Sequence, residues 1–450
     1  MRDPTPAATP MLDFSTLPNF CSHEHWGSLA SFTMTPEGFR NDVYQGARPQ
    51  RRHSLVDLVL DPYLHGWIWA AGGNTAEFAR AVAGTDDIWQ AAADHPGELL
   101  VVLRPLLRQH ELTGALQCIR RGIHFCLGVD IMTASAAELD EADARCATAY
   151  ETTFPWYRDV MARASFTKLI RPVHPEYFVW SDGPDLAVQD RAINDPILRI
   201  DPLMDLWSAE SPRRDGLAKI TGVDPADAAS WRKFLDKVFG IARDCGTTGI
   251  KQLQAYTRDL DYKRRADGEV RFRGDLSPAE VTAFQDWVMH ECFARAHELG
   301  WPHQVHIGTH NHPRSNPLPL EAAAKAYPRQ QLVLLHCWPY LSESGYLAKQ
   351  LPNVHIDTCW QPVLNPQFFR RALREWLGYV PTHKIMLAHD ATSIEMAVGS
   401  SLFTREILAE ELWRWGGGLG LGEARLRAIA TDMLHNNAVR LYGIGELAAP

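Results

Sequence analysis

The second half of the sequence alternates short apolar segments with longer amphipathic ones, and this rhythm restricts the fold more than any other feature. Runs such as QLVLLH (331–336) and NVHID (353–357) have the length and composition of buried strands. Between such runs lie segments whose apolar residues are spaced for one face of a helix, as at 227–244 and 342–350. Strands that alternate with helices form a parallel sheet, so the pattern predicts an α/β fold.

Eight strands can be identified in this way, which is the number that closes a (β/α)8 barrel. The first would end in SHEH at residues 22–25. The other seven strands are predicted at 166–172, 197–201, 247–253, 303–308, 331–336, 353–357 and 383–390. Helices are predicted at 227–244, 277–300, 318–326, 342–350, 367–377 and 402–415.

Residues 35–160 interrupt this order. They are rich in tryptophan and mostly helical in pattern, as in WIWAAGG and GALQCIRRG, so we expect a large helical insertion after the first strand. A chain of 450 residues would often hold two or three domains, but an α/β barrel with insertions reaches this length as one. We therefore predict a single TIM barrel over residues 1–450 with a helical insertion at about 35–160.

The composition is that of a soluble globular protein, with 46% hydrophobic and 22% charged residues. A net charge of −9 argues against nucleic acid as a partner. No apolar run is long enough for a signal peptide or a membrane span, so we expect no membrane partner. The eight cysteines are scattered without a CxxC pair, which favours reduced thiols in the cytoplasm. We expect a small-molecule substrate, and the exposed faces of the insertion leave a homo-oligomer open.

Polar side chains stand at the ends of five predicted strands, where a (β/α)8 barrel places its chemistry. They are His23 and His25, Lys251, His306, His336 and Asp390, on strands 1, 4, 5, 6 and 8 respectively. Imidazole and carboxylate groups suit zinc, manganese or iron. Because alternate strand residues point the same way, His23 and His25 can face inward while Glu24 faces outward. Each residue alone could be ordinary packing, and Asp390 could cap a helix, but five in one register favour a metal site.

These segments resemble the amidohydrolase superfamily, in particular the amidohydrolase-related branch that includes nodulin-like domains fused to glutamine synthetase. The shared pattern is HxH on strand 1, Lys on strand 4, His on strands 5 and 6 and Asp on strand 8. The resembling segments are GIKQLQAYTRDL (249–260), LLHCWPYLSESGYLAKQLPNVHIDTCW (334–360) and KIMLAHDATSIEM (384–396). The likeness covers roughly residues 225–440 together with the HxH motif.

The resemblance implies a ligand set. His23, His25 and Asp390 would bind one divalent ion, for which we expect zinc, with manganese or iron as alternatives. His306 and His336 would bind a second ion or contact the first ion or the substrate.

Lys251 would bridge two ions if CO2 carboxylates it. A carbamate supplies two oxygens and a negative charge between two cations, whereas an unmodified ammonium would be repelled there.

The predicted function is that of a metal-dependent hydrolase acting on an amide, lactone or related C–N or C–O bond through metal-activated water. Asp390 would carry the proton as general acid and base, and His336 or His306 would stabilise the oxyanion. The first alternative is a nonoxidative decarboxylase of an aromatic or unsaturated acid. The second is a uronate-isomerase-like enzyme, which HIGTHNHPRSN (306–316) faintly resembles, or a non-catalytic metal-binding barrel.

Five further residues are candidates for binding an anionic or ring-bearing substrate. They are Arg258, His310, His312, Trp338 and Trp360. Packing at the barrel rim is the alternative role of Trp338 and Trp360, and exposure to solvent is that of His310 and His312.

Overall fold

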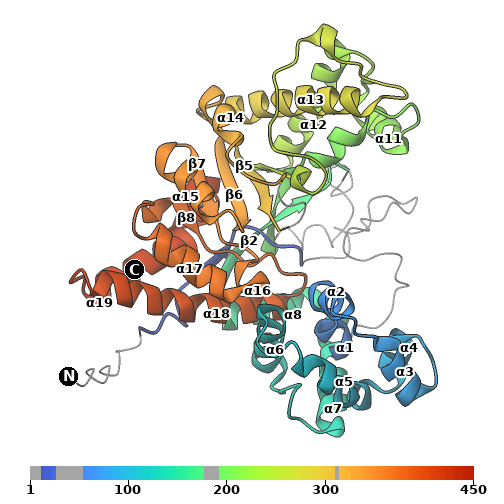
Figure 1. The fold of residues 1–450 in the computed structure, drawn as a ribbon, viewed down its shortest axis with the longest axis vertical. Coiled ribbons are helices and arrows are strands. Elements are labelled where there is room, and N and C mark those ends of the chain that lie inside the picture. The colour runs from blue at the N-terminus through green and yellow to red at the C-terminus, as the bar shows by residue number, and fades with distance from the viewer. Residues whose placement is uncertain (1–11, 27–53, 177–191, 310–313, 450) are drawn as a thin grey trace.

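A computed structural model of the 450-residue chain describes residues 12–26, 54–176, 192–309 and 314–449. Eight parallel strands form one sheet in the order β1 to β8, which confirms the predicted (β/α)8 barrel (Figure 1). The strands are β1 (Asn19–Cys21), β2 (Phe166–Val173), β3 (Asn194–Arg199), β4 (Ile250–Gln252), β5 (Pro302–Gly308), β6 (Gln331–Trp338), β7 (Val354–Asp357) and β8 (Ile385–Met386). No helix in the described ranges is both long and apolar enough to cross a membrane.

The barrel closes just beyond the last strand, where the segment after β8 runs beside the end of β1. The backbone N–H of Asp390 donates to the carbonyl of His23 (3.0 Å), and the N–H of His25 donates to the carbonyl of Ala391 (3.1 Å). Strand β8 itself has two residues, whereas the sequence predicted a strand over 383–390. Residues 387–390 therefore lie outside the strand. The hydrogen bonds that close the barrel bring Asp390 next to the HxH motif.

Helices connect the strands and form the outer layer. From β3 onward they are η2 (Asp201–Asp205), α11 (Pro212–Thr221), α12 (Ala228–Asp244), η3 (Gln254–Tyr256), η4 (Asp267–Glu269), α13 (Pro278–Leu299), α14 (Leu320–Ala326), α15 (Leu341–Gln350), α16 (Gln361–Leu364), α17 (Pro366–Trp376), η5 (Thr382–Lys384), α18 (Ile394–Leu412), η6 (Trp413–Gly417), α19 (Glu423–Thr431), η7 (Asp432–Asn436) and α20 (Asn437–Tyr442).

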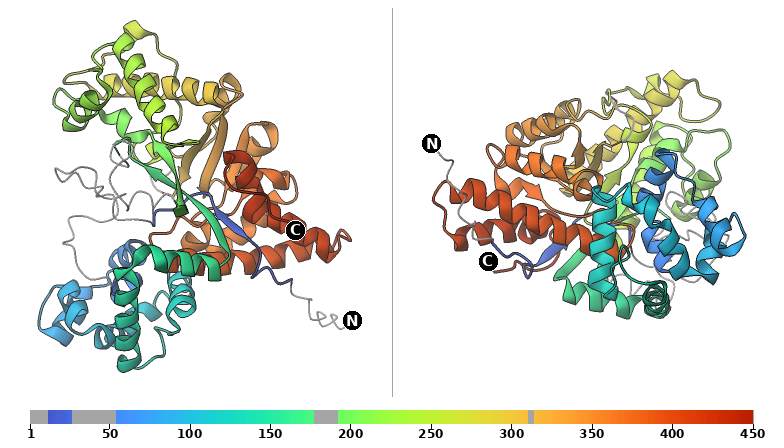
Figure 2. Two further views of the ribbon diagram at one scale, coloured as in Figure 1. Left: turned by 180° about the vertical axis from the view of Figure 1, so that it is seen from behind. Right: turned by 60° about the horizontal axis from the view of Figure 1, so that its bottom comes forward.

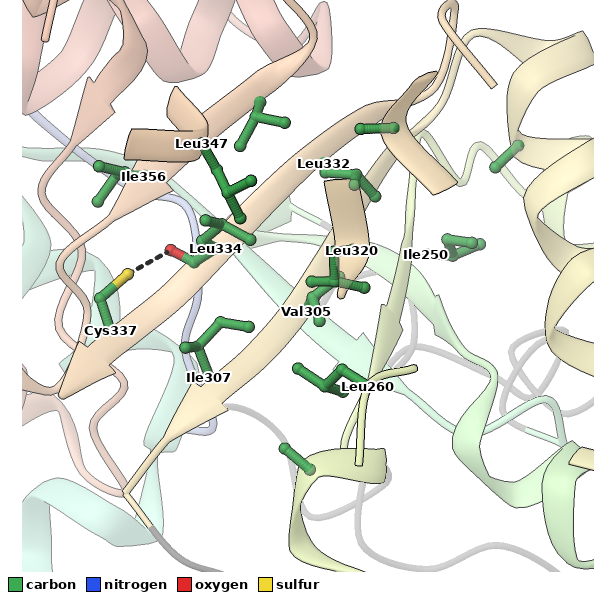
Figure 3. Packing of buried hydrophobic residues seen from close by; sticks show 14 of the residues in the cluster. Ile250, Leu260, Val305, Ile307, Leu320, Leu332, Leu334, Cys337, Leu347 and Ile356 are labelled. Atoms are coloured by element: carbon green, nitrogen blue, oxygen red, sulfur yellow. Dashed lines mark hydrogen bonds between the residues drawn. The ribbon is translucent and has the colours of Figure 1, made fainter. Parts of the chain in front are cut away.

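The sheet packs against these helices through alternate residues of its strands. Val305 and Ile307 of β5 lie with Leu332 of β6 in the layer between sheet and helices (Figure 3). Because neighbouring strand residues face opposite sides, Val333 and Leu335 of β6 point the other way and belong to a separate buried cluster. The same alternation turns the even-numbered residues of β5 toward the barrel interior.

Between β1 and β2 the chain forms a helical lobe beside the barrel, seen from two further sides in Figure 2. Its helices are α1 (Leu55–Val59), α2 (Pro62–Ala70), α3 (Thr75–Ala83), α4 (Ile88–Asp94), α5 (Pro96–Arg108), α6 (Gly114–Leu127), α7 (Ala136–Glu151) and α8 (Thr153–Arg163). The predicted helical insertion at about 35–160 is therefore present from residue 55 onward, and residues 35–53 lie outside the described ranges.

Helix α18 joins the lobe to the barrel, and its start was wrongly predicted. It begins at Ile394, where the Ser393 side chain caps it by accepting from the N–H of Met396 (3.1 Å), and not at 402. Nearly its whole surface is buried, so its first turns lack the one-sided apolar pattern that reveals a surface helix. The buried carboxylate of Glu395 accepts from the Tyr150 hydroxyl (2.8 Å) and the Trp156 indole N–H (3.1 Å) of the lobe.

Candidate metal centre

Three of the predicted ligands meet at the closure of the barrel. Nε2 of His25 lies 3.2 Å, and Nε2 of His23 lies 3.6 Å, from Oδ1 of Asp390. All three side chains are buried. Two ligands that each lie ~2.0–2.1 Å from a tetrahedral zinc ion are about 3.3–3.4 Å apart. The spacing of these donor atoms is therefore that of ligands around one ion.

His336 completes the group on the β6 side. Its Nε2 lies 3.6 Å from Oδ2 of Asp390 and 3.0 Å from Nδ1 of His306. The thiol of Cys359 lies 3.4 Å from the other nitrogen of His336, and His336, Cys359 and Asp390 form a second set of donors within 4.8 Å of one another. We name His23, His25, His336 and Asp390 the candidate metal centre.

Two hydrogen bonds fix which nitrogen each histidine presents. Oε1 of Gln304 can only accept, so Nδ1 of His23 must donate to it (2.7 Å), and Nε2 keeps its lone pair for the centre. In the same way Nδ1 of His336 donates to the carbonyl of Cys359 (2.9 Å). Partners of this kind hold metal-binding imidazoles in one tautomer and orientation.

The backbone at the ends of β6 and β8 departs from regular strand geometry. Because Leu335 faces the barrel interior, strict alternation would turn His336 toward the helices. His336 (φ +65°) and Cys337 (φ +58°) instead adopt the left-handed conformation, which breaks the alternation and keeps His336 inside. Asp390 (φ +53°) is left-handed too. Such conformations cost non-glycine residues about 1–3 kcal/mol each and are concentrated at functional sites.

Burial sets the charge states of the candidate metal centre. It holds the pKa of His23 well below its ordinary value, aided by the charge of Lys251, and lowers that of His336 to about 4. Burial alone would raise the pKa of Asp390, but the surrounding imidazoles lower it more, so the net pKa lies below its ordinary value. Neutral imidazoles beside an ionised carboxylate are the forms that bind metals.

Lys251 of β4 and His306 of β5 are buried beside this group. Burial, with a smaller contribution from the Arg199 guanidinium, lowers the pKa of Lys251 to about 8. The ring of His306 lies 4.5 Å from that of His336, and its Nε2 is 2.6 Å from the Thr309 hydroxyl. The structure thus brings all six predicted ligands to one end of the barrel.

These residues fit a divalent ion. Nε2 of His23 is fully buried and finds no hydrogen-bond partner within the described residues, although it faces the Asp390 carboxylate. An unpaired buried nitrogen is costly unless something binds it. The lone pair of this nitrogen, the Asp390 carboxylate and the neighbouring imidazoles together form a set of ligands that zinc prefers.

A cavity of 990 Å³ lies at the barrel mouth between the sheet and the helical lobe. Its described lining residues are Pro62, Tyr63, Gly66, Trp67, Leu112, Thr113, Gly114, Asp201, Asp205, Leu253, Gln254, Tyr256, Thr257, Thr309, Trp338, Trp360, Leu364, Asn365, Pro366 and Gln367. We name it the mouth cavity. Its lining touches the metal-site residues, because the ring of Tyr256 lies 4.4 Å from that of His306 and the ring of Trp360 lies 5.5 Å from that of His336.

The predicted substrate residues divide into three groups. Trp338 and Trp360 line the mouth cavity. Arg258 does not, because its guanidinium is bound to the buried carboxylate of Asp286 (2.7 Å). His310 and His312 lie outside the described residues.

Several residues of the site were missed by the sequence analysis. Gln304 stands two positions before His306 on β5, so strand alternation could have indicated that it faces the same way. Cys359 follows β7, a strand to which no metal ligand was assigned. Tyr63 and Trp67 come from helix α2 of the lobe, and no local pattern in the sequence shows that this helix borders the barrel mouth.

Comparisons with known proteins agree with this geometry. A family model described as amidohydrolase matches residues 228–444, which include Lys251, His306, His336 and Asp390. Protein fluG of Emericella nidulans is 28% identical over 239 residues. That alignment covers 48% of this chain but only 28% of fluG, so the chain corresponds to little more than a quarter of this relative.

Two solved structures share the fold over nearly the whole chain. The uronate isomerase of Thermotoga maritima superposes with a TM-score of 0.71 at 13% identity, covering 95% of each chain. The glucuronate isomerase of Caulobacter crescentus gives a TM-score of 0.69 at 16% identity, covering 99% of each chain. At such identities the likeness concerns the fold. Residues 228–444 are thus similar to the amidohydrolase family, and the eight-stranded barrel agrees with that likeness.

Proposed function

We propose that this protein is a metal-dependent hydrolase of a small molecule with an amide, lactone or related C–N or C–O bond. The observation that carries the proposal is the convergence of His23, His25 and Asp390, buried and spaced as ligands of one ion. Zinc is the ion that this donor set favours, with manganese or iron as alternatives. His306 and His336 would serve a second ion or the substrate.

The side chains of the site have distinct roles in this reaction. A bound ion supplies a water of lowered pKa and polarises the scissile carbonyl. Asp390 accepts the proton of the attacking water and passes it to the leaving group, for which its ionised carboxylate is suited. The Nδ1–H of His306 could turn to donate to the oxyanion that develops on the carbonyl, whereas Nε2 of His336 carries a lone pair and would bind an ion.

An isomerase of a uronate is the second candidate, because the fold likeness to such enzymes covers at least 95% of the chain. A uronate carries a carboxylate, however, and no lysine, arginine or histidine is among the described residues that line the mouth cavity. Hydrolysis of an uncharged amide or lactone does not require a basic side chain in the cavity.

Elemental analysis and variants test the metal ligands. We expect His23→Ala and Asp390→Asn to lose both the metal and the turnover of an amide and lactone panel, while circular dichroism stays that of the folded barrel. His355→Ala is the matched control, because His355 lies on β7 with its Nε2 on Gln331 (3.0 Å), outside the candidate metal centre. Metal contents equal to that of the wild type in both ligand variants would contradict the assignment.

We also propose that Lys251 is carboxylated when two ions are bound. Native mass spectrometry of the metal-loaded protein should then show the added mass of one CO2. Lys251→Ala should remove this mass and leave at most one ion per chain. Two ions bound to a protein without the added mass would refute the bridging role.

A further inference from the structure

The mouth cavity has aromatic walls on both sides. Helix α2 of the lobe contributes Tyr63 and Trp67, and the strand ends contribute Tyr256, Trp338 and Trp360. The ring centroids of Tyr63 and Trp360 are 4.6 Å apart, so the lobe and the barrel meet in an aromatic contact at the edge of the cavity. A space bounded by such flat faces accommodates a ring better than a branched chain.

The aromatic walls lead directly to the candidate metal centre. Besides the contact of Trp360 with His336, the hydroxyl of Tyr63 lies 3.5 Å from the carbonyl oxygen of Asp390. A group held between these rings therefore has its reactive end at the metal centre and its remaining part in the cavity. The proposed hydrolase activity by itself does not specify which group of a substrate lies in the cavity.

The charged groups among the described lining residues are all acidic. Asp201 and Asp205 are the only ionisable carboxyl groups among the described lining residues, and no basic side chain accompanies them. Asp201 is neutralised by Arg199, which donates to both of its oxygens (3.2 and 2.6 Å). Asp205 is exposed to the cavity and forms no ion pair within the part of the chain that the structure describes.

Asp205 therefore gives the cavity a negative charge that a ligand can match. Partial burial and the neighbouring Asp201 raise the pKa of Asp205 by more than the nearby Arg213 guanidinium and the Gln285 side chain lower it. A cation nearby would stabilise it, and aromatic faces add a cation–π attraction. An anionic group would be repelled by this carboxylate, and no lysine, arginine or histidine of the described lining offsets the repulsion.

We propose that the mouth cavity selects substrates with an aromatic ring that is neutral or bears an amine, and rejects substrates with a carboxylate on that ring. The proposal rests on the proposed hydrolase, since it names the substrate class of the same site. Asp205 would hold the ammonium group, and Trp67 would cover the ring.

Three acetanilides that differ in one substituent test this selection. They are 4-(aminomethyl)acetanilide, 4-methylacetanilide and 4-acetamidobenzoate, which share the ring and the scissile amide but are cationic, neutral and anionic at pH 7. Binding to the zinc-loaded full chain is measured by the fluorescence of its tryptophans, and anilide hydrolysis is measured separately. We expect the cationic probe to bind at least tenfold more tightly than the anionic one, with the neutral probe between them.

Two variants with matched controls locate the effect. Asp205→Asn should abolish the advantage of the cationic over the neutral probe, whereas Asp215→Asn, on α11 outside the lining, should retain it. Trp67→Ala should weaken all three probes at least fivefold, whereas Trp69→Ala, whose side chain is 77% exposed, should not.

The outcomes separate this inference from the function on which it rests. The expected order of binding without hydrolysis would refute the hydrolase and keep the cavity's selectivity. Hydrolysis with equal or tighter binding of the anionic probe would overturn the inference and leave the hydrolase intact. Equal loss of affinity in Trp67→Ala and Trp69→Ala would show that the probes bind elsewhere, which overturns the inference too.

Discussion

At the scale of single residues, the candidate metal centre depends on backbone conformations that strands do not normally contain. His336, Trp360 and Asp390 all have positive φ values and all border the metal site or the mouth cavity. A strand alone could not direct Leu335 and His336 to the same side. The left-handed turn at His336 achieves this, and the surrounding packing must supply its free-energy cost.

The amide of Gln304 is predicted to control metal affinity through His23. Gln304→Met keeps the length of the side chain but leaves Nδ1 of His23 without its acceptor. We expect zinc affinity, measured by competition with a chelator, to fall about 10–100-fold. Tyr442→Phe is the control, because it removes only a partner of the Gln304 amide nitrogen (2.7 Å) and leaves His23 oriented. Equal affinities of Gln304→Met and Tyr442→Phe would contradict this positioning role.

The ion pair of Arg120 and Asp130 is predicted to make the helical lobe sensitive to acid. Two hydrogen bonds (2.7 and 2.6 Å) from Arg120 lower the pKa of Asp130 to about 2. Since the folded pKa lies below the unfolded one, the stabilisation is complete above about pH 4 and is lost as the pH falls toward about 2.

Asp130→Asn should therefore lower the free energy of unfolding by about 1 kcal/mol at pH 7. In urea titrations the difference from the wild type should shrink at pH 3. Asp159→Asn removes the more exposed pair with Arg163 and should change stability by less than ~0.5 kcal/mol at either pH. A difference that does not depend on pH would refute the ionic origin.

At the scale of elements, the contact between α6 and α18 attaches the lobe to the barrel. A Cβ atom at Gly122 would collide with the backbone of Glu395, and one at Gly399 with the carbonyl of Cys118. Both glycines have ordinary helical geometry, so their role is to let the two backbones approach closely. The approach places α16 and the start of α18, and with them the segment that carries Asp390, against the lobe.

Gly399→Ala is predicted to destabilise the protein by about 2–3 kcal/mol, because the methyl group has no space between the two helices. Gly240→Ala in α12 is the matched control. No atom lies within 4 Å of a Cβ at that position, so alanine should stabilise the helix by about 0.5–1 kcal/mol. Chemical denaturation of both variants measures the difference, and equal effects would contradict the close packing of α6 on α18.

At the scale of the whole molecule, one of the buried clusters spans both the lobe and the barrel. The cluster around Leu100 and Ile123 of the lobe extends without interruption to Trp360, Val363 and Ile394 of the barrel. The mouth cavity lies along this junction and has walls from both sides. The proposed substrate selection thus depends on the junction, whereas the predicted metal ligands lie at the strand ends.

This shared core predicts cooperative unfolding. We expect calorimetry to show one unfolding transition for the wild type. If the lobe unfolded without the barrel, the residues of α18 that it covers would become exposed to solvent. Gly399→Ala should lower the temperature of that whole transition. Two resolved transitions in the wild type would mean that the lobe folds independently.

The sequence by itself determined the barrel and the positions of the candidate ligands along it. The spacing of apolar residues in a strand or helix involves only near neighbours in the sequence, so a segment such as QLVLLH can be assigned locally. Residues at the carboxyl ends of parallel strands then lie together at one end of the barrel. This is why His23, His25, Lys251, His306, His336 and Asp390 could all be assigned to one end of the barrel.

Only the tertiary structure decided the rest. The two-sided burial of α18 hid its first turns, and the left-handed turn that keeps His336 inside has no local signature. The pairing of Arg258 with Asp286 and the approach of Trp67 to the barrel mouth join residues far apart in the chain. Such contacts follow from how the elements pack, because a side chain's partner is set by shape and charge across the fold and not by its neighbours in sequence.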